Sequence, residues 1–190
     1  MNPEVFLGNN SITIRRISSV VEIEAAAALG TGTTSLRPKS EFVTLFTRDC
    51  AQPDQALLLG AFDAASLIGY ARVAYFAHRD DAPMNCSPSG WYLLGVVVHP
   101  KWVRQGLATR LTTERLTWAA ARSREIFYVA KPDNVASIEM HRKLGFLEMA
   151  CNVSIPPALS GLTLFRLPLA NRAGSGEDIT CGSCAHLHLR

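Results

Sequence analysis

Apolar and polar positions alternate along this chain in short blocks that predict a regular succession of strands and helices. Strand patterns occur at residues 12–15, 56–62, 66–76, 91–98, 127–130, 147–155 and 161–167. Helical patterns occur at residues 20–29, 40–49, 107–122 and 135–144, and Gly30 and Gly145 are expected to end the first and the last of them. Strands and helices interleaved in this way predict an α/β fold, with a mixed central β-sheet of about six to seven strands flanked by helices on both faces.

Two further patterns refine this picture. The helix at 107–122 has an apolar face, interrupted by Arg115, that carries Ala108, Leu111, Thr112, Leu116 and Ala119. Residues 30–40 are rich in glycine, threonine and serine, but no Gly-Lys-Ser/Thr follows them, which favours a plain flexible loop over a phosphate loop. Residues 78–90 form a polar loop before the strand at 91–98.

A chain of 190 residues with 48% hydrophobic residues is long enough for one domain with a full core, which we place at residues 1–169. Residues 170–190 change to a linker-like composition and are expected to form a disordered tail. Two thiols and two imidazoles in this tail could bind zinc adventitiously, or the two cysteines could form a disulfide; the residues concerned are Cys181, Cys184, His186 and His188. We expect no structural or catalytic metal.

Charge and hydropathy narrow the range of partners. The net charge of +3 comes without a long basic run, so no nucleic-acid partner is expected. No apolar run approaches the roughly 18 residues of a membrane span, and residues 1–4 lack the features of a signal peptide, so we expect a cytoplasmic protein without a membrane partner. The five cysteines are odd in number and mostly scattered, so the fold should not depend on disulfides.

The most informative segment is residues 94–111, where an apolar strand runs through a basic, glycine-containing turn into a helix. Pro100 closes off the strand, Arg104 adds a positive charge, and Gly106 allows a ligand to approach the backbone. A helix that begins there presents unpaired N–H groups and a positive dipole end, so the turn is predicted to hold an anion such as a phosphate.

A second informative segment follows at residues 127–146. Its pattern predicts a strand, a turn with Asp133 or Asn134 as the helix N-cap, a short helix, and Gly145 as a left-handed C-cap before Phe146 begins the next strand.

Together the two segments resemble the GNAT superfamily of acyl-CoA N-acyltransferases, over residues 12 to about 168. That family carries a pyrophosphate-binding motif, Gln/Arg-x-x-Gly-x-Gly/Ala, followed by an Asn-x-x-Ala/Ser…Tyr/His-x-x-x-Gly-Phe helix. The resemblance implies an N-acetyltransferase that moves an acetyl group from acetyl-CoA to a primary amine of a small molecule or protein, by direct transfer in a ternary complex. It also suggests a possible homodimer formed through the closing strands.

The resemblance further implies which residues bind the cofactor. The backbones of Val96, Val97 and Val98 would pair with the pantetheine arm, and the N–H of Val98 would polarise the thioester carbonyl. The pyrophosphate loop would comprise Arg104, Gln105, Gly106, Leu107, Ala108 and Thr109. Asn134, which is also a candidate helix cap, and Ser137 would contact the cofactor from the second helix. The leading Gln/Arg of the first motif falls on Val103 here, and we expect this difference to weaken cofactor binding.

The candidate catalytic residue is His141, at the position where many relatives carry a tyrosine that protonates the departing thiolate. An imidazolium with a free pKa of about 6.5 can protonate a thiolate whose acid has a pKa of about 8.5. A structural role, or a contact to pantetheine, is an equal alternative for this residue.

The general base is not assigned. Some relatives carry a glutamate where this chain has Val129, so that carboxylate is missing. The remaining candidates, chosen by rough placement only, are Tyr92, His99, Glu41 and His78, and a water chain is the other option. The substitutions at Val103 and Val129 motivate an alternative function, a catalytically silent module that binds acyl-CoA as a sensor. A third hypothesis is a metal-dependent interaction protein that works through the tail.

Overall fold

The computed structural model describes residues 12–33, 37–155 and 159–169. The predicted tail at 170–190, with its cysteines and histidines, lies outside the described residues. Along the chain the elements are β1 (Thr13–Arg16), α1 (Val20–Thr33), α2 (Lys39–Ala51), β2 (Ala56–Asp63), β3 (Ser66–Phe76), β4 (Gly90–Val98), the 3-10 helix η1 (Pro100–Trp102), α3 (Leu107–Ala120), β5 (Glu125–Ala130), α4 (Val135–Lys143), β6 (Leu147–Ile155) and β7 (Leu159–Pro168).

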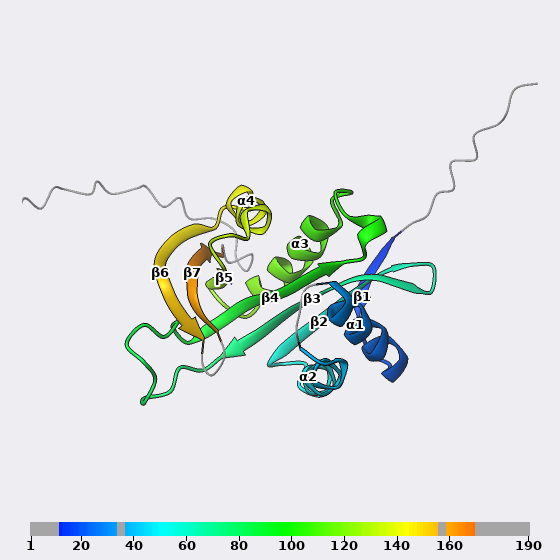
Figure 1. Ribbon diagram of the computed structural model, residues 1–190, viewed down its shortest axis with the longest axis horizontal. Coiled ribbons are helices and arrows are strands. Elements are labelled where there is room, and N and C mark those ends of the chain that lie inside the picture. Colours follow the sequence, from blue (N-terminus) through cyan, green and yellow to red (C-terminus); the bar gives the residue numbers. More distant parts are fainter. Residues whose placement is uncertain (1–11, 34–36, 156–158, 170–190) are drawn as a thin grey trace, which may run out of the picture.

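Within the described residues, seven strands form one mixed sheet in the order β1-β2-β3-β4-β5-β7-β6, as Figure 1 shows. Every neighbouring pair is antiparallel except β4 and β5, which run parallel because α3 carries the chain back between them. The predicted fold class, an α/β sheet flanked by helices, is confirmed.

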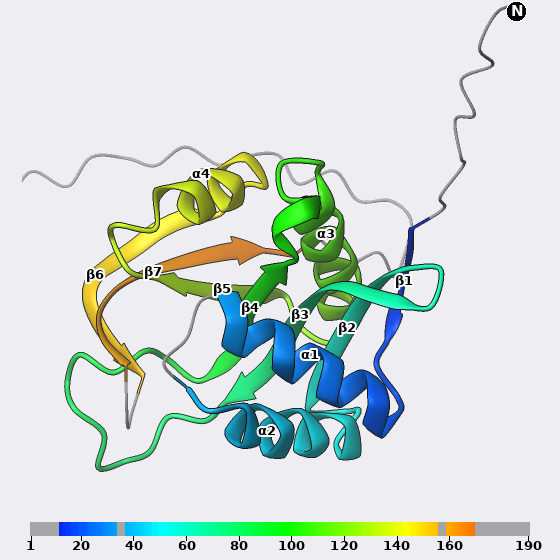
Figure 2. The same cartoon turned by 45° about the vertical axis from the view of Figure 1, so that its right-hand side comes forward.

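Alternate residues of β2 belong to two hydrophobic clusters on opposite faces of the sheet. Leu57, Leu59 and Val73 pack with α3 and with Ile138 of α4 in one cluster. Leu58 and Tyr70 pack with α1 and α2 in the other. Figure 2 shows α1 and α2 together on their side of the strands. Because successive side chains of a strand point to opposite faces, β2 is apolar on both faces and packs against helices on both sides of the sheet.

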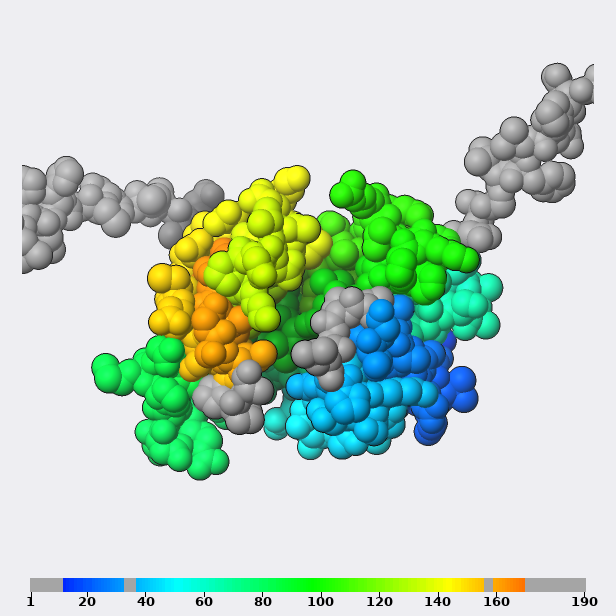
Figure 3. Space-filling view, in the orientation of Figure 1, coloured from blue at the N-terminus to red at the C-terminus, as the bar shows by residue number. Residues whose placement is uncertain are grey.

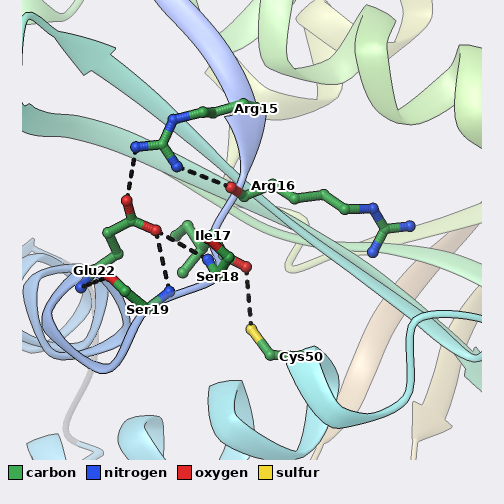
Figure 4. Close-up of polar contacts among 7 residues, drawn as sticks. All are labelled: Arg15, Arg16, Ile17, Ser18, Ser19, Glu22 and Cys50. Atoms are coloured by element: carbon green, nitrogen blue, oxygen red, sulfur yellow. Dashed lines mark hydrogen bonds and ion pairs between the residues drawn. The ribbon is translucent and has the colours of Figure 1, made fainter.

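The first turn of α1 is fixed by a reciprocal capping interaction that the sequence pattern Ser19-x-x-Glu22 encodes. The Glu22 backbone N–H donates to Ser19 Oγ at 3.2 Å, and the Glu22 carboxylate accepts the N–H groups of Ser18 at 2.9 Å and of Ser19 at 3.3 Å (Figure 4). Arg15 donates to the same carboxylate at 2.6 Å. These bonds, led by the one from Arg15, lower the pKa of Glu22 to about 2.

Replacing Glu22 with alanine is expected to lower the free energy of unfolding at pH 7 by about 1 kcal/mol, because the N–H groups of Ser18 and Ser19 lose the carboxylate that accepts them. Glu22→Gln is the matched control: its amide oxygen still accepts the N–H groups, so its loss should be smaller. The folded-state pKa of Glu22, about 2, lies below its ordinary value of 4.5. The stabilisation that depends on the charge of Glu22 is therefore fully present above pH 4.5 and is lost as the pH falls toward 2. Urea denaturation of the three proteins across this range measures both effects, and equal stability at pH 7 would contradict them.

The prediction that Gly30 ends the first helix is wrong, because α1 continues to Thr33. A Cβ atom on Gly30 would lie 2.6 Å from the Tyr70 hydroxyl oxygen and 3.3 Å from the ring of Phe42. Gly30 is therefore placed where α1 approaches β3 and α2 closely, and it does not act as a terminator. The predicted loop at 30–40 accordingly loses its first residues to α1 and its last two to α2.

Candidate active site

The candidate site begins where β4 and β5 separate. These parallel strands pair only at Tyr92 with Phe127 and at Leu93 with Tyr128. Beyond Leu93, β4 remains paired on its other side to β3, through Val96, Val97 and Val98 opposite Ala71, Tyr70 and Gly69. The second half of β4 thus has one edge that is not paired with β5.

A β-bulge lies at this point of separation. Arg72 of β3 pairs with Leu94, whereas Ala71 pairs with Val96, so Gly95 is an extra residue in β4. Its φ of +41° is in the left-handed region, which a glycine adopts without strain. The bulge bends β4 where it leaves β5. Figure 3 shows the surface hollowed between α4 and the segment of η1 and α3.

The turn that is predicted to hold an anion lies at the end of this free edge. Gly106 precedes α3 with a φ of +77°, no side chain caps the helix, and no acidic residue lies in its first turn. The first intrahelical bond runs from Arg110 N–H to Gly106 O at 3.0 Å, which leaves the N–H groups of Leu107, Ala108 and Thr109 without an intrahelical acceptor. These donors at a helix N-terminus fit a pyrophosphate.

The residues just before α3 support the same interpretation. Arg104 is exposed and has a φ of +62°, a costly conformation for a residue with a side chain that is found mostly at functional sites. The Gln105 side chain donates to the Lys101 carbonyl at 3.0 Å and thereby braces the loop. Val103, which replaces the expected polar residue, is 50% exposed and ends η1.

The second motif lies across the hollow on α4. Asn134 is the N-cap residue of α4 and is exposed, but its side chain makes no capping hydrogen bond, so the amide is available to a ligand. Ser137 is half-buried, and its Oγ accepts the Tyr128 hydroxyl at 2.6 Å. Because Tyr128 is also the last residue of β5 paired with β4, this bond ties α4 to the point where the strands separate.

His141 is 1% exposed, and its ring stacks on that of Tyr128 with centroids 3.6 Å apart. Its Nδ1 lies 2.8 Å from the Ser137 carbonyl oxygen, so Nδ1 carries the proton and Nε2 is left without a partner in the described residues. Burial lowers the pKa of His141 to about 4. The imidazole is therefore neutral at physiological pH, which favours the structural alternative over an imidazolium acid.

The four candidates for a general base lie on four separate segments. Tyr92 is fully buried, donates to the Pro88 carbonyl at 2.7 Å, and has its pKa raised by burial, so it stays protonated. Glu41 lies in the first turn of α2, 3.6 Å from Arg37. His78 lies in the loop before β4, and His99 caps η1, accepting the Lys101 N–H at 3.3 Å.

Two features of the site were not foreseen from the sequence. A glycine inside an apolar run is a known signal for a bulge, and Gly95 could have been found on that basis. The contacts of Tyr128 with Ser137 and His141 link two elements that are adjacent only in the folded chain, so no local sequence pattern predicts them.

Among the described residues, no three histidine, cysteine, aspartate or glutamate side chains gather closely enough to hold a metal ion.

A bulged strand that leaves its parallel neighbour, followed by an uncapped helix N-terminus, is the arrangement expected of an acyl-CoA-dependent transferase. A family model described as the acetyltransferase (GNAT) family matches residues 23–146. The chain belongs to this family and is an acyltransferase. Comparison with curated protein sequences gives no match.

Solved structures share the fold at low sequence identity. A phosphinothricin acetyltransferase from Sinorhizobium meliloti, solved with acetyl-CoA, has a TM-score of 0.65 at 16% identity and covers 88% of this chain and 94% of its own. The ribosomal-protein-S18-alanine N-acetyltransferase of Escherichia coli has a TM-score of 0.63 at 16% identity, with 90% and 99% covered. An aminoglycoside 6'-N-acetyltransferase from Acinetobacter haemolyticus has a TM-score of 0.61 at 23% identity, with 77% and 99% covered.

The described helices include none that is both long and apolar enough to cross a membrane.

Proposed function

We propose that this chain transfers an acetyl group from acetyl-CoA to a primary amine of a small molecule or protein, by direct attack in a ternary complex. The observation that carries the proposal is the free edge of β4 leading into the uncapped N-terminus of α3. An extended pantetheine arm can pair with such an edge as an added strand would, while a pyrophosphate reaches the helix N-terminus.

The roles of the residues follow from this placement. The backbones of Val96, Val97 and Val98 pair with the pantetheine arm, and a backbone N–H of this segment, that of Val98, polarises the thioester carbonyl. The loop from Arg104 to Thr109 holds the pyrophosphate, largely through N–H groups. Asn134 and Ser137 contact the cofactor from α4, on the opposite side of the hollow.

The departing thiolate lies toward α4 in this arrangement. His141 is proposed to act there through its neutral ring, which holds Tyr128 and Ser137 in place. Ser137 Oγ accepts a hydrogen bond from the Tyr128 hydroxyl, so its own hydroxyl hydrogen is free to donate to the sulfur. As an acid, His141 would have to bind a proton against the burial that lowers its pKa to about 4.

The acceptor is proposed only as a primary amine. The three solved relatives named above act on phosphinothricin, on the alanine of a ribosomal protein and on aminoglycosides, so one fold serves both small molecules and proteins. A homodimer and a cytoplasmic location remain predictions of the sequence.

The test is a calorimetric titration of acetyl-CoA into the purified chain, followed by a thiol-release assay with a panel of amines that spans amino acids, aminoglycosides and peptide N-termini. We expect binding with one site per chain and release of free thiol with at least one class of amine. Binding without turnover on any amine would favour the silent sensor instead. No binding at all would contradict the proposed donor.

A further inference from the structure

Arg115 is a buried cation that the proposed chemistry does not yet use. It lies on the face of α3 that packs against the sheet and is 1% exposed. Its Nη1 donates to the carbonyl oxygens of Arg72 at 3.1 Å and Leu94 at 3.3 Å, and its Nη2 donates to Thr112 Oγ1 at 2.7 Å. The guanidinium therefore reaches two neighbouring strands at once.

No carboxylate of the described residues forms an ion pair with Arg115. The buried carboxylate of Asp49 lies on α2 and is engaged by the Arg72 side chain at 2.6 Å. Burial lowers the pKa of Arg115 to about 9, which still leaves it charged at neutral pH. An unpaired buried cation is costly, and an apolar side chain of similar volume would often serve packing equally well or better. Packing alone therefore does not account for an arginine at this position.

The two carbonyl groups that Arg115 engages belong to the residue pair next to the β4 bulge. Arg72 and Leu94 are the pair at which the register of β3 and β4 shifts, because Gly95 is the extra residue. A bulge interrupts the ladder, and buried carbonyl groups left by it need other donors. Arg115 supplies them beside Leu93, the last residue at which β4 pairs with β5.

The charge also acts on the backbone itself. The Leu94 carbonyl and the Gly95 N–H belong to one peptide group, and hydrogen bonds that share a group strengthen one another. A guanidinium on this carbonyl therefore makes the adjoining N–H a stronger donor, in the part of β4 that has a free edge. The same cation interacts electrostatically with Tyr128, the residue opposite Leu93.

We propose that Arg115 is a positioning residue for acyl transfer, which holds the β4 bulge in the shape that presents the strand's free edge to the pantetheine arm and thioester. This inference rests on the proposed function, because it requires acetyl-CoA to bind along β4. The proposal concerns one part of the cofactor site, the β4 edge, whose geometry depends on Arg115. The other part, the N-terminus of α3, is not contacted by Arg115.

The test uses Arg115→Met, Arg115→Lys and, as a matched control, Arg122→Met just beyond the end of α3. Each protein is titrated with acetyl-CoA and with 3'-phosphoadenosine 5'-diphosphate, the part of coenzyme A that remains when the pantetheine arm is removed. Thermal unfolding confirms that each variant is folded. The infrared carbonyl stretch of acetyl-CoA, bound at saturating protein, reports how strongly the thioester is polarised.

We expect Arg115→Met to raise the Kd for acetyl-CoA about tenfold, the worth of about one good hydrogen bond, and to leave the Kd for 3'-phosphoadenosine 5'-diphosphate unchanged. The carbonyl stretch should move toward its value in free acetyl-CoA. Arg115→Lys keeps the positive charge but has fewer hydrogen-bond donors, so we expect it to weaken acetyl-CoA binding about threefold and to leave nucleotide binding unchanged. This variant tests the proposal if the methionine variant does not fold. Arg122→Met should behave as the wild type.

Wild-type Kd values for acetyl-CoA in both Arg115 variants would overturn the inference and leave the proposed function intact. Equal weakening of both ligands would also overturn it, because that pattern describes general damage to α3. Failure of the wild type to bind acetyl-CoA would instead remove the proposed function, and this inference with it.

Discussion

Replacing Arg104 and Gly106 together with glutamate is expected to weaken acetyl-CoA binding by about 100-fold or more. The double variant removes one positive charge and adds two negative charges at a helix N-terminus that presents free N–H groups to a pyrophosphate. Two like charges about 5 Å apart repel by about 3 kcal/mol at an effective dielectric constant of about 20, which corresponds to about 100-fold in Kd. Calorimetric titration of acetyl-CoA measures the change directly.

The control for this prediction is the double variant Arg104→Gln, Gly106→Gln, which has almost the same shape as the double glutamate variant but adds no negative charge. A Cβ on Gly106 meets nothing within 4 Å, so both side chains fit, and both carry the same strain at a φ of +77°. We expect the glutamine variant to lose less than about tenfold in affinity, and high salt to recover part of the loss in the glutamate variant. Equal losses in the two would show that backbone strain or the loss of Arg104, and not the added negative charge, weakens binding.

The order of the elements could be predicted because each one has a local signal. The alternation at 56–62 and 66–76 anticipates β2 and β3 to within a residue, and the left-handed Gly145 ends α4 as its position suggested, with a φ of +94°. Gly30 misled the prediction because glycine serves two purposes. It ends helices, and it also allows close packing, and only the contact with Tyr70 shows which purpose applies.

The site was less predictable because it depends on contacts between distant segments. The strand-to-helix turn at Gly106 is a local motif, and α3 begins directly after it without a side-chain cap. The separation of β4 from β5, in contrast, depends on where two strands stop pairing, and no short pattern encodes that. Arg115 looked like an interruption of the apolar face of α3. Its function becomes apparent only when the bulge at Gly95 is seen beside it.

The neutral state of His141 makes a second, independent prediction, which concerns stability. Its folded-state pKa of about 4 lies below the ordinary value of 6.5, because burial disfavours the charged ring. The unfolded chain therefore binds a proton that the folded chain does not, as the pH falls from 6.5 toward 4. We expect the free energy of unfolding to decline by about 3 kcal/mol across this range from His141 alone.

His141→Phe isolates this effect, since a phenyl ring can still stack on Tyr128 but cannot titrate. Urea denaturation of both proteins between pH 7 and pH 4 gives the difference in stability at each pH, in which the carboxylates common to both cancel. That difference should move in favour of the phenylalanine variant below pH 6.5. A difference that stays constant with pH would mean that His141 binds a proton in the folded protein as readily as in the unfolded chain. The imidazolium would then be available in the folded site, and His141 would again be a candidate for the acid that protonates the departing thiolate.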